Sequence, residues 1–230
     1  MTNDKKFFIF NICLFICDMI CLVYYNHTGG TLFKGVTSSW FVILGAVNLI
    51  YAQKKNLEKY SFLIFMELAL TSGMIADVVL CIWFIPGVLV FALGHIFYLF
   101  AFYRVEKFCS RDIKSIIPIG IVSLYILIGT PYVQVEDKFI EIVLLGYAVV
   151  ISCMLGKTVS NFKQEKSTSR ILLLVGGILF WFSDVMLAGT LFGNGGQAMV
   201  LLCSYTYWPG QNILALSMYY YVREKMIVKE

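Results

Sequence analysis

Charged residues are scarce in this chain. They make up 14% of its 230 residues, whereas 60% of the residues are hydrophobic; a soluble domain of this size would carry roughly 25% charged residues. Basic side chains outnumber acidic ones only by 18 to 14. This excess is too small to indicate nucleic acid as a partner, although it suits loops that face anionic lipid. The composition therefore excludes an ordinary soluble domain and predicts an all-α protein that crosses the lipid bilayer many times.

Several types of active site lack the residues they need. A zinc hydrolase uses three protein ligands, typically rich in histidine, but the chain has only two histidines, His27 and His95. Its seven cysteines form no C-x-x-C pair, so we expect them to pack as small side chains within helices. Neither the G-x-S-x-G elbow of serine hydrolases nor a glycine-rich phosphate loop occurs. We expect no metal and no cofactor, which leaves acid–base chemistry by carboxyl groups.

The apolar residues are grouped into runs of about 20 residues, the length that crosses a bilayer as a helix. Eight such runs predict one integral membrane domain over residues 1–230, with helices at about 7–25, 35–53, 61–83, 86–103, 113–131, 139–155, 171–191 and 198–222. The first run follows Lys5 and Lys6 as in a signal peptide, but it has the length of a full span and no A-x-A cleavage site. We therefore expect it to remain in the protein as a helix.

The basic residues fall on alternate connections between these runs. The N-terminus, the loops around Lys54, Lys107 and Lys163, and the C-terminus hold 16 of the 18 basic residues, whereas the opposite side holds only Lys34 and Lys138. Short loops rich in Lys and Arg stay on the cytoplasmic side of a membrane. The pattern predicts a multi-pass membrane protein, in the cell membrane if it is bacterial, with both termini in the cytoplasm.

Two aspartates interrupt the apolar runs, Asp77 in the third and Asp184 in the seventh. An ionisable group in hydrocarbon costs at least ~2.5–3.5 kcal/mol, so it is kept there when it is paired or used. In both halves a tyrosine follows 21 positions later, Tyr98 and Tyr205 respectively. Spans 1–4 and 5–8 have the same orientation. The repeated spacing of aspartate and tyrosine therefore predicts a parallel 4+4 repeat about an axis along the membrane normal.

The two carboxyl groups are expected at similar depth. At about 1.5 Å per helical residue, Asp77 and Asp184 both fall in the outer half of the bilayer. His95 and Tyr98 share a face of the fourth span, and Lys34 marks the outer end of the second. We expect these groups to line one cavity open to the outer leaflet. Structural alternatives are a hydrogen-bonded pair of acids, a satisfied core histidine, and a lysine that only snorkels to the interface.

Five short segments, in this order and spacing, resemble the YhhN family of membrane lysoplasmalogenases. They are FK at 33–34 with Thr37, the Asp77 segment that ends near Pro86, LGHIFY at 93–98, FSD at 182–184 and YWPGQ at 207–211. Two positions depart from the family pattern: Gly35 stands where the family has proline, and Ala76 precedes Asp77 where glycine is usual. Neither departure changes a titratable group.

The resemblance implies a hydrolase with eight spans that cleaves the vinyl ether bond of lysoplasmalogens. The products are a fatty aldehyde and glycerophosphocholine or glycerophosphoethanolamine, and the implied partners are the lysophospholipid substrate and the bilayer. Hydrolysis of a vinyl ether passes through an oxocarbenium ion, for which glycosidases use two carboxyl groups. We expect Asp77 and Asp184 to be catalytic. The supporting or substrate-binding residues are expected to be Lys34, His95, Tyr98, Ser183, Tyr205, Tyr207 and Gln211.

Lys34 has three alternative roles. Near the interface it can bind the lipid phosphate, which we favour slightly. It can instead pair with Asp77 or Asp184 and set the protonation of that carboxyl group, or it can snorkel without any role in the reaction.

Two other functions use intramembrane acids. An intramembrane aspartyl protease also has two, but its G-x-G-D and Tyr-Asp signatures are absent, since Asp77 follows Ile75-Ala76 and Asp184 follows Phe182-Ser183. A proton-coupled transporter or a lipid sensor would carry protons on buried carboxyl groups. Release of an aldehyde separates the ether hydrolase from both alternatives.

Overall fold

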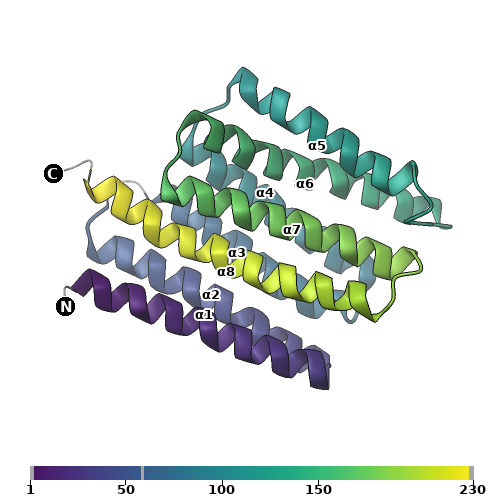
Figure 1. The fold of residues 1–230 in the computed structure, drawn as a ribbon, viewed down its shortest axis with the longest axis horizontal. Coiled ribbons are helices and arrows are strands. Elements are labelled where there is room, and N and C mark those ends of the chain that lie inside the picture. The colour runs from purple at the N-terminus through teal and green to yellow at the C-terminus, as the bar shows by residue number, and fades with distance from the viewer. Residues whose placement is uncertain (1–2, 58–59, 228–230) are drawn as a thin grey trace.

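The computed structural model describes residues 3–57 and 60–227, and within them the chain forms eight α-helices and no strand. The helices are α1 (Asn3–Thr28), α2 (Thr31–Lys54), α3 (Ser61–Leu80), α4 (Phe84–Val105), α5 (Ser110–Ile128), α6 (Lys138–Gln164), α7 (Thr168–Phe192) and α8 (Gln197–Ile227). They lie side by side as one bundle of long rods (Figure 1). The predicted all-α bundle is confirmed.

Six of the helices are long and apolar enough to cross a membrane: α1 to α4, α6 and α7. The two other predicted spans, α5 and α8, fall short of this because charged or polar residues interrupt them. α5 begins with Arg111, Asp112 and Lys114, and α8 buries Gln211 and Asn212. Both lie alongside the six apolar helices (Figure 1). The polar residues of α8 are therefore turned into the bundle, and a hydropathy average understates how well this helix suits a membrane.

The helix contacts repeat between the two halves of the chain. In each half the first helix packs on the second, the second on the third and the third on the fourth, and the halves meet through the equivalent pairs α4–α6 and α8–α2. This is the pattern expected for the parallel 4+4 repeat. The halves also differ, because α8 packs on α1 and α3 as well, whereas the extensive contacts of α5 in the described chain are with α6. α5 therefore lies at the edge of the bundle (Figure 1).

One predicted helix is longer than expected. The apolar run ends at Leu155, but α6 continues to Gln164 and buries Lys157 completely. The Lys157 ammonium lies 2.9 and 3.0 Å from the two carboxylate oxygens of Asp112 and 3.1 Å from the Lys107 carbonyl oxygen. Asp112 is also fully buried, in the first turn of α5. The ion pair explains how a lysine is accommodated in this helix, and it fastens the start of α5 to α6.

The surroundings of Asp112, just before the expected span at 113–131, also fix its charge. Burial alone would raise the pKa of its carboxyl group, but hydrogen bonds from Ser160, the Cys109 backbone N–H and Lys157 hold the pKa below its usual value. A carboxyl group whose folded-state pKa is depressed contributes stability at every pH above its unfolded value of about 3.9. That contribution is lost as the pH falls through the folded pKa, so it belongs to the acid limb of the stability profile.

Replacing Lys157 with Met is expected to lower the free energy of unfolding by about 3–5 kcal/mol, because Asp112 is left as an unpaired buried charge. Lys157→Met/Asp112→Asn removes that charge and should recover most of the loss, with a weaker fall in stability below about pH 4. Thermal unfolding in detergent measures both effects. The control is Lys138→Met, an exposed lysine of the same helix; equal stability of the two single variants would contradict the structural role of Lys157.

The start of α1 and the end of α8 lie at the same end of the bundle (Figure 1). Together with the basic loops this arrangement predicts that both termini face the cytoplasm. Single cysteines placed beside Lys54, Lys107 and Lys163 in a cysteine-free background should react with a membrane-impermeant maleimide only after the membrane is opened. Labelling of any of these loops from outside would overturn the topology.

Candidate active site

The first cluster surrounds Asp77, a buried residue of α3. On its Oδ2 it accepts hydrogen bonds from the Ser38 hydroxyl at 2.6 Å and the Tyr207 hydroxyl at 2.8 Å. The Lys34 ammonium lies 3.3 Å from Oδ1. Lys34 and Ser38 are one turn apart on α2, and Tyr207 comes from α8. Three donors, one of them charged, thus converge on this carboxyl group, which is how a carboxylate is accommodated in an apolar interior.

This cluster extends along α8 and α4 through Gln211. The Gln211 amide nitrogen lies 3.4 Å from the Tyr207 hydroxyl, and its Oε1 accepts the hydroxyl of the buried Tyr98. Gly73 explains how the amide fits, because a Cβ at this position would lie 2.9 Å from Gln211 Nε2. The structure therefore brings Tyr98, Tyr207 and Gln211 together beside Asp77.

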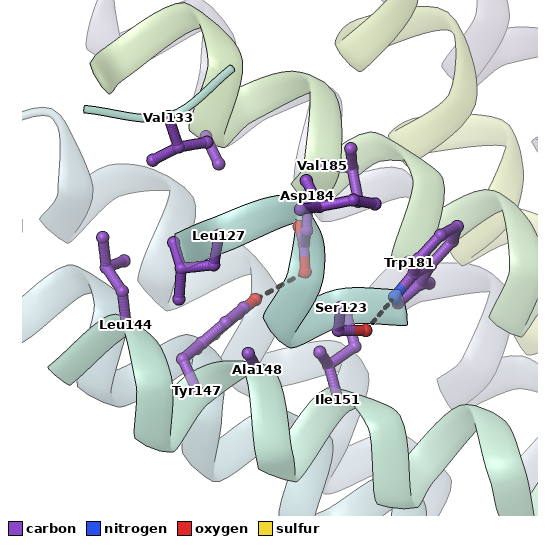
Figure 2. Close-up of a pocket in the computed structure, with 12 residues that line it drawn as sticks. Ser123, Leu127, Val133, Leu144, Tyr147, Ala148, Ile151, Trp181, Asp184 and Val185 are labelled. Atoms are coloured by element: carbon purple, nitrogen blue, oxygen red, sulfur yellow. Dashed lines mark hydrogen bonds between the residues drawn. The ribbon is translucent and has the colours of Figure 1, made fainter. Parts of the chain in front are cut away.

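The second cluster surrounds Asp184 of α7. The Tyr147 hydroxyl of α6 donates to Asp184 Oδ2 at 2.6 Å (Figure 2), and Nε2 of His95 on α4 lies 3.4 Å from the same oxygen. His95 Nε2 and the Tyr147 hydroxyl are 2.7 Å apart, and His95 Nδ1 lies 3.3 Å from the sulfur of Met154. His95 is fully buried, whereas the Asp184 side chain is 14% exposed. Asp184 is thus the more accessible of the two carboxyl groups.

The two clusters are equivalent within the repeat. Each aspartate is on the third helix of its half, and its partners come from the second helix of the same half and the fourth helix of the other half. For Asp77 these are α2 and α8, and for Asp184 they are α6 and α4. The donors differ: a lysine, a serine and a tyrosine hold Asp77, whereas a tyrosine and a histidine hold Asp184. The same architecture therefore carries two carboxyl groups in different electrostatic surroundings.

One aromatic ring lies between the clusters. The Phe180 ring of α7 is 5.3 Å from the Tyr207 ring and 4.6 Å from the His95 ring, measured between centroids. His95 and Tyr98 are one turn apart on α4, as predicted, yet His95 serves Asp184 whereas Tyr98 belongs to the Asp77 cluster. The two clusters are thus neighbours joined through packed side chains.

Two apolar cavities meet at Asp184. The first lies between α5, α6 and α7, and we call it the α5–α7 cavity (Figure 2). The second lies between α4, α6 and α7 and touches the end of α3; we call it the α4–α7 cavity. Both are lined by Leu144, Tyr147, Asp184 and Ala188. Asp77 lines neither, so these cavities expose one aspartate where a single cavity with both was expected.

Two other predicted residues lie apart from this chemistry. Ser183 is buried and donates to the Phe180 carbonyl oxygen at 2.6 Å, within its own helix. Tyr205 is 47% exposed on the outer surface of α8 and belongs to neither cluster. Its repeat partner Tyr98 is fully buried, so the matched spacing of the two tyrosines does not give them matched surroundings.

Lys34 contacts Asp77, as in the second of its three alternative roles, pairing with an aspartate. Its contact with a lipid phosphate stays a prediction.

Two members of the clusters were not predicted. Ser38 follows Lys34 by four positions and so shares its helix face; that spacing could have identified it. Tyr147 is a single tyrosine in an apolar run with no motif around it. Only the packing of α6 against α7 brings it to Asp184.

A third buried carboxyl group, Asp18 of α1, is connected to the first cluster. It accepts a hydrogen bond from the Asn212 amide on Oδ2, while Oδ1 has no partner among the described residues. Asn212 also donates to the Trp208 carbonyl oxygen, and the Trp208 indole N–H donates to Ser38 at 3.2 Å. Since Ser38 donates to Asp77, a continuous polar network extends from α1 to the first aspartate.

In residues 3–57 and 60–227 no three His, Cys, Asp or Glu side chains are grouped so as to hold a metal ion.

Comparison with known proteins gives one finding: the sequence model of the YhhN family matches residues 8–218. This range includes every member of both clusters. No curated protein and no solved structure matches the chain.

Proposed function

The chain belongs to the YhhN family, and on this basis we propose that it hydrolyses the vinyl ether bond of lysoplasmalogens inside the membrane. Family membership supports a lysoplasmalogenase-like membrane protein. The observation that carries the finer proposal is the position of Asp184, a hydrogen-bonded carboxyl group between two apolar cavities. The products are a fatty aldehyde and glycerophosphocholine or glycerophosphoethanolamine.

The reaction begins when an acid donates a proton to the outer alkene carbon of the vinyl ether. The carbon that bears oxygen becomes an oxocarbenium ion, water adds to it, and the resulting hemiacetal collapses to the aldehyde and the glycerol hydroxyl. The active site must therefore supply a proton, stabilise a cation and direct a water molecule. Carboxyl groups do all three in glycosidases, which form a similar cation.

Asp184 is the group that touches the substrate in this proposal. Tyr147 and His95 both contact its Oδ2, which fixes the carboxyl group and leaves Oδ1 to exchange the proton. After donating it, Asp184 is negatively charged beside the cation and then accepts a proton from the attacking water. Tyr147 and His95, 2.7 Å apart, stay hydrogen-bonded to each other, so the carboxyl group keeps its orientation while it gives up this proton and regains one from water.

Asp77 is the second carboxyl group of the proposal. The Phe180 ring separates it from the Asp184 cluster. Its carboxyl group is held by Lys34, Ser38 and Tyr207. A negative charge in this apolar interior attracts the oxocarbenium ion more strongly than it would in water. Lys34 limits the net charge of the cluster, so it tunes how strongly Asp77 acts.

Proton-coupled transport is the second candidate function. The hydrogen-bonded series from Tyr98 through Gln211 and Tyr207 to Asp77 is of the kind that carries protons in membrane transporters. The deciding assay is aldehyde release by purified protein from lysoplasmenylcholine and lysoplasmenylethanolamine, with the saturated-ether analogue as control. Cleavage of the vinyl ether alone supports the proposal, whereas no aldehyde, or equal cleavage of both ethers, overturns it.

Asp77→Asn and Asp184→Asn should each lower kcat by about 10²–10⁴-fold, because Asn keeps the size of the side chain but removes the negative charge of Asp77 or the proton transfer by Asp184. The control is Glu67→Gln, a carboxyl group of α3 whose buried Oε2 has no hydrogen-bond partner among the described residues. Folding of each variant is checked by its thermal unfolding. Near-normal turnover by either aspartate variant refutes the two-carboxyl mechanism.

Lys34→Gln should lower kcat at least about 10-fold, equivalent to about 1.4 kcal/mol of transition-state stabilisation, and shift its pH profile. The reason is the 3.3 Å contact with Asp77. Lys34→Arg keeps the charge and should retain more activity. A rise in KM alone, present for the phosphorylated lipid and absent for its dephosphorylated analogue, would show instead that Lys34 binds the phosphate.

A further inference from the structure

The two cavities at Asp184 lie at different heights along α7. The α5–α7 cavity is lined by Trp181, Asp184, Val185 and Ala188, whereas the α4–α7 cavity is lined by Asp184, Leu187, Ala188, Leu191 and Phe192. At about 1.5 Å per residue the whole series extends over about 16 Å. Along α7 the α4–α7 cavity therefore lies nearer the expected outer end, whereas the α5–α7 cavity extends from Val133, in the connection between α5 and α6, down to Trp181 and so reaches deeper into the membrane.

This order matches the order of parts in a lipid of the outer leaflet. Its headgroup lies at the interface, its ether bond lies below, and its hydrocarbon chain points to the midplane. A lysolipid whose vinyl ether is at Asp184 would have its glycerol side toward the α4–α7 cavity and its chain toward the α5–α7 cavity. Apart from Asp184, Tyr147 and Ser123, the α5–α7 cavity is lined by apolar and aromatic side chains (Figure 2), as a hydrocarbon chain requires.

Hydrogen-bonded side chains line the α5–α7 cavity near Trp181. The Trp181 indole N–H donates to the Ser123 hydroxyl at 2.9 Å (Figure 2), and this hydroxyl lies 3.0 Å from that of Ser152. Ser152 also donates to the Ala148 carbonyl oxygen at 2.6 Å. Helices α5, α6 and α7 are thus tied together at one level, and the large Trp181 ring that lines the cavity there is held in place by its hydrogen bond.

The position of α5 at the edge of the bundle suits access from the bilayer. Its extensive contacts are with α6, its start is fastened by Asp112 and Lys157, and Pro118 interrupts its backbone hydrogen bonds before the cavity. Its outward side chains, among them Ile121 and Tyr125, are exposed. One wall of the cavity is therefore a helix with lipid on its other side.

We propose that the α5–α7 cavity binds the single hydrocarbon chain of the lysolipid and that Trp181 sets the chain length that is accepted. This inference rests on the proposed function and adds the specificity residue of the same site. The occupant is one chain, because a lysolipid carries only one, and its end would meet the Trp181 ring, which the hydrogen bond to Ser123 holds in place.

The test measures kcat/KM over a series of lysoplasmenylcholines that differ only in alkenyl chain length. Trp181→Ala removes the large ring that lines the cavity and should raise the ratio of kcat/KM for long over short chains about 10-fold. This is within the range of specificity that contacts between a pocket and methylene groups supply. Ala148→Leu fills the same cavity and should shift the preference to shorter chains. Trp40→Ala, a partly buried tryptophan of α2 outside the cavity, is the matched control and should leave the preference unchanged. An unchanged preference in both cavity variants overturns the proposal.

A binding measurement separates this proposal from the hydrolase proposal. A saturated-ether lysolipid with a photoreactive diazirine at the end of its chain is irradiated on the protein, and the labelled residues are found by mass spectrometry. Labels on peptides that contain Ser123, Ile151 or Trp181, lost in Ala148→Leu, support the chain site even if no vinyl ether is cleaved. Labels confined to α4 and the end of α7, or to the outer surface, refute the chain site even if the protein proves to be a hydrolase.

Discussion

The structure depends on how a carboxyl group is kept inside hydrocarbon. An unpaired charge there is unstable by several kcal/mol, so each aspartate needs donors from other helices, and those donors fix which helices must be neighbours. Asp77 requires α2 and α8 beside α3, and Asp184 requires α4 and α6 beside α7. The interleaving of the two halves follows from these requirements, since each aspartate is held by both halves at once.

Hydropathy and charge were sufficient for the fold, because lipid allows few alternatives to a helix bundle. They were not sufficient for the end of α6. A lysine after an apolar run predicts a loop, but Lys157 is helical and buried because its ammonium pairs with Asp112 and donates to the Lys107 carbonyl oxygen. The two acids were identified for a similar physical reason: a carboxyl group within an apolar run is conspicuous at any position along it.

The partners of the acids were harder to predict, because they depend on how helices cross. Tyr98 and Gln211 could be assigned to a site from their spacing, but not to a particular aspartate; His95, one turn from Tyr98, turned out to contact the other one. Tyr147 carries no local signal, and Tyr205 occupies a promising position yet faces outward. Helical spacing gives the face of one helix, and the rotation of its neighbour decides what that face meets.

The order of partners along the chain has a consequence for biogenesis. His95 and Tyr147 precede Asp184, so the second site has all its groups once α7 has been synthesised. Asp77 has Lys34 and Ser38 before it, but Tyr207 belongs to the last helix. During translation the first site therefore stays incomplete until α8 arrives, and a chain truncated ahead of α8 exposes an imperfectly paired carboxylate to lipid.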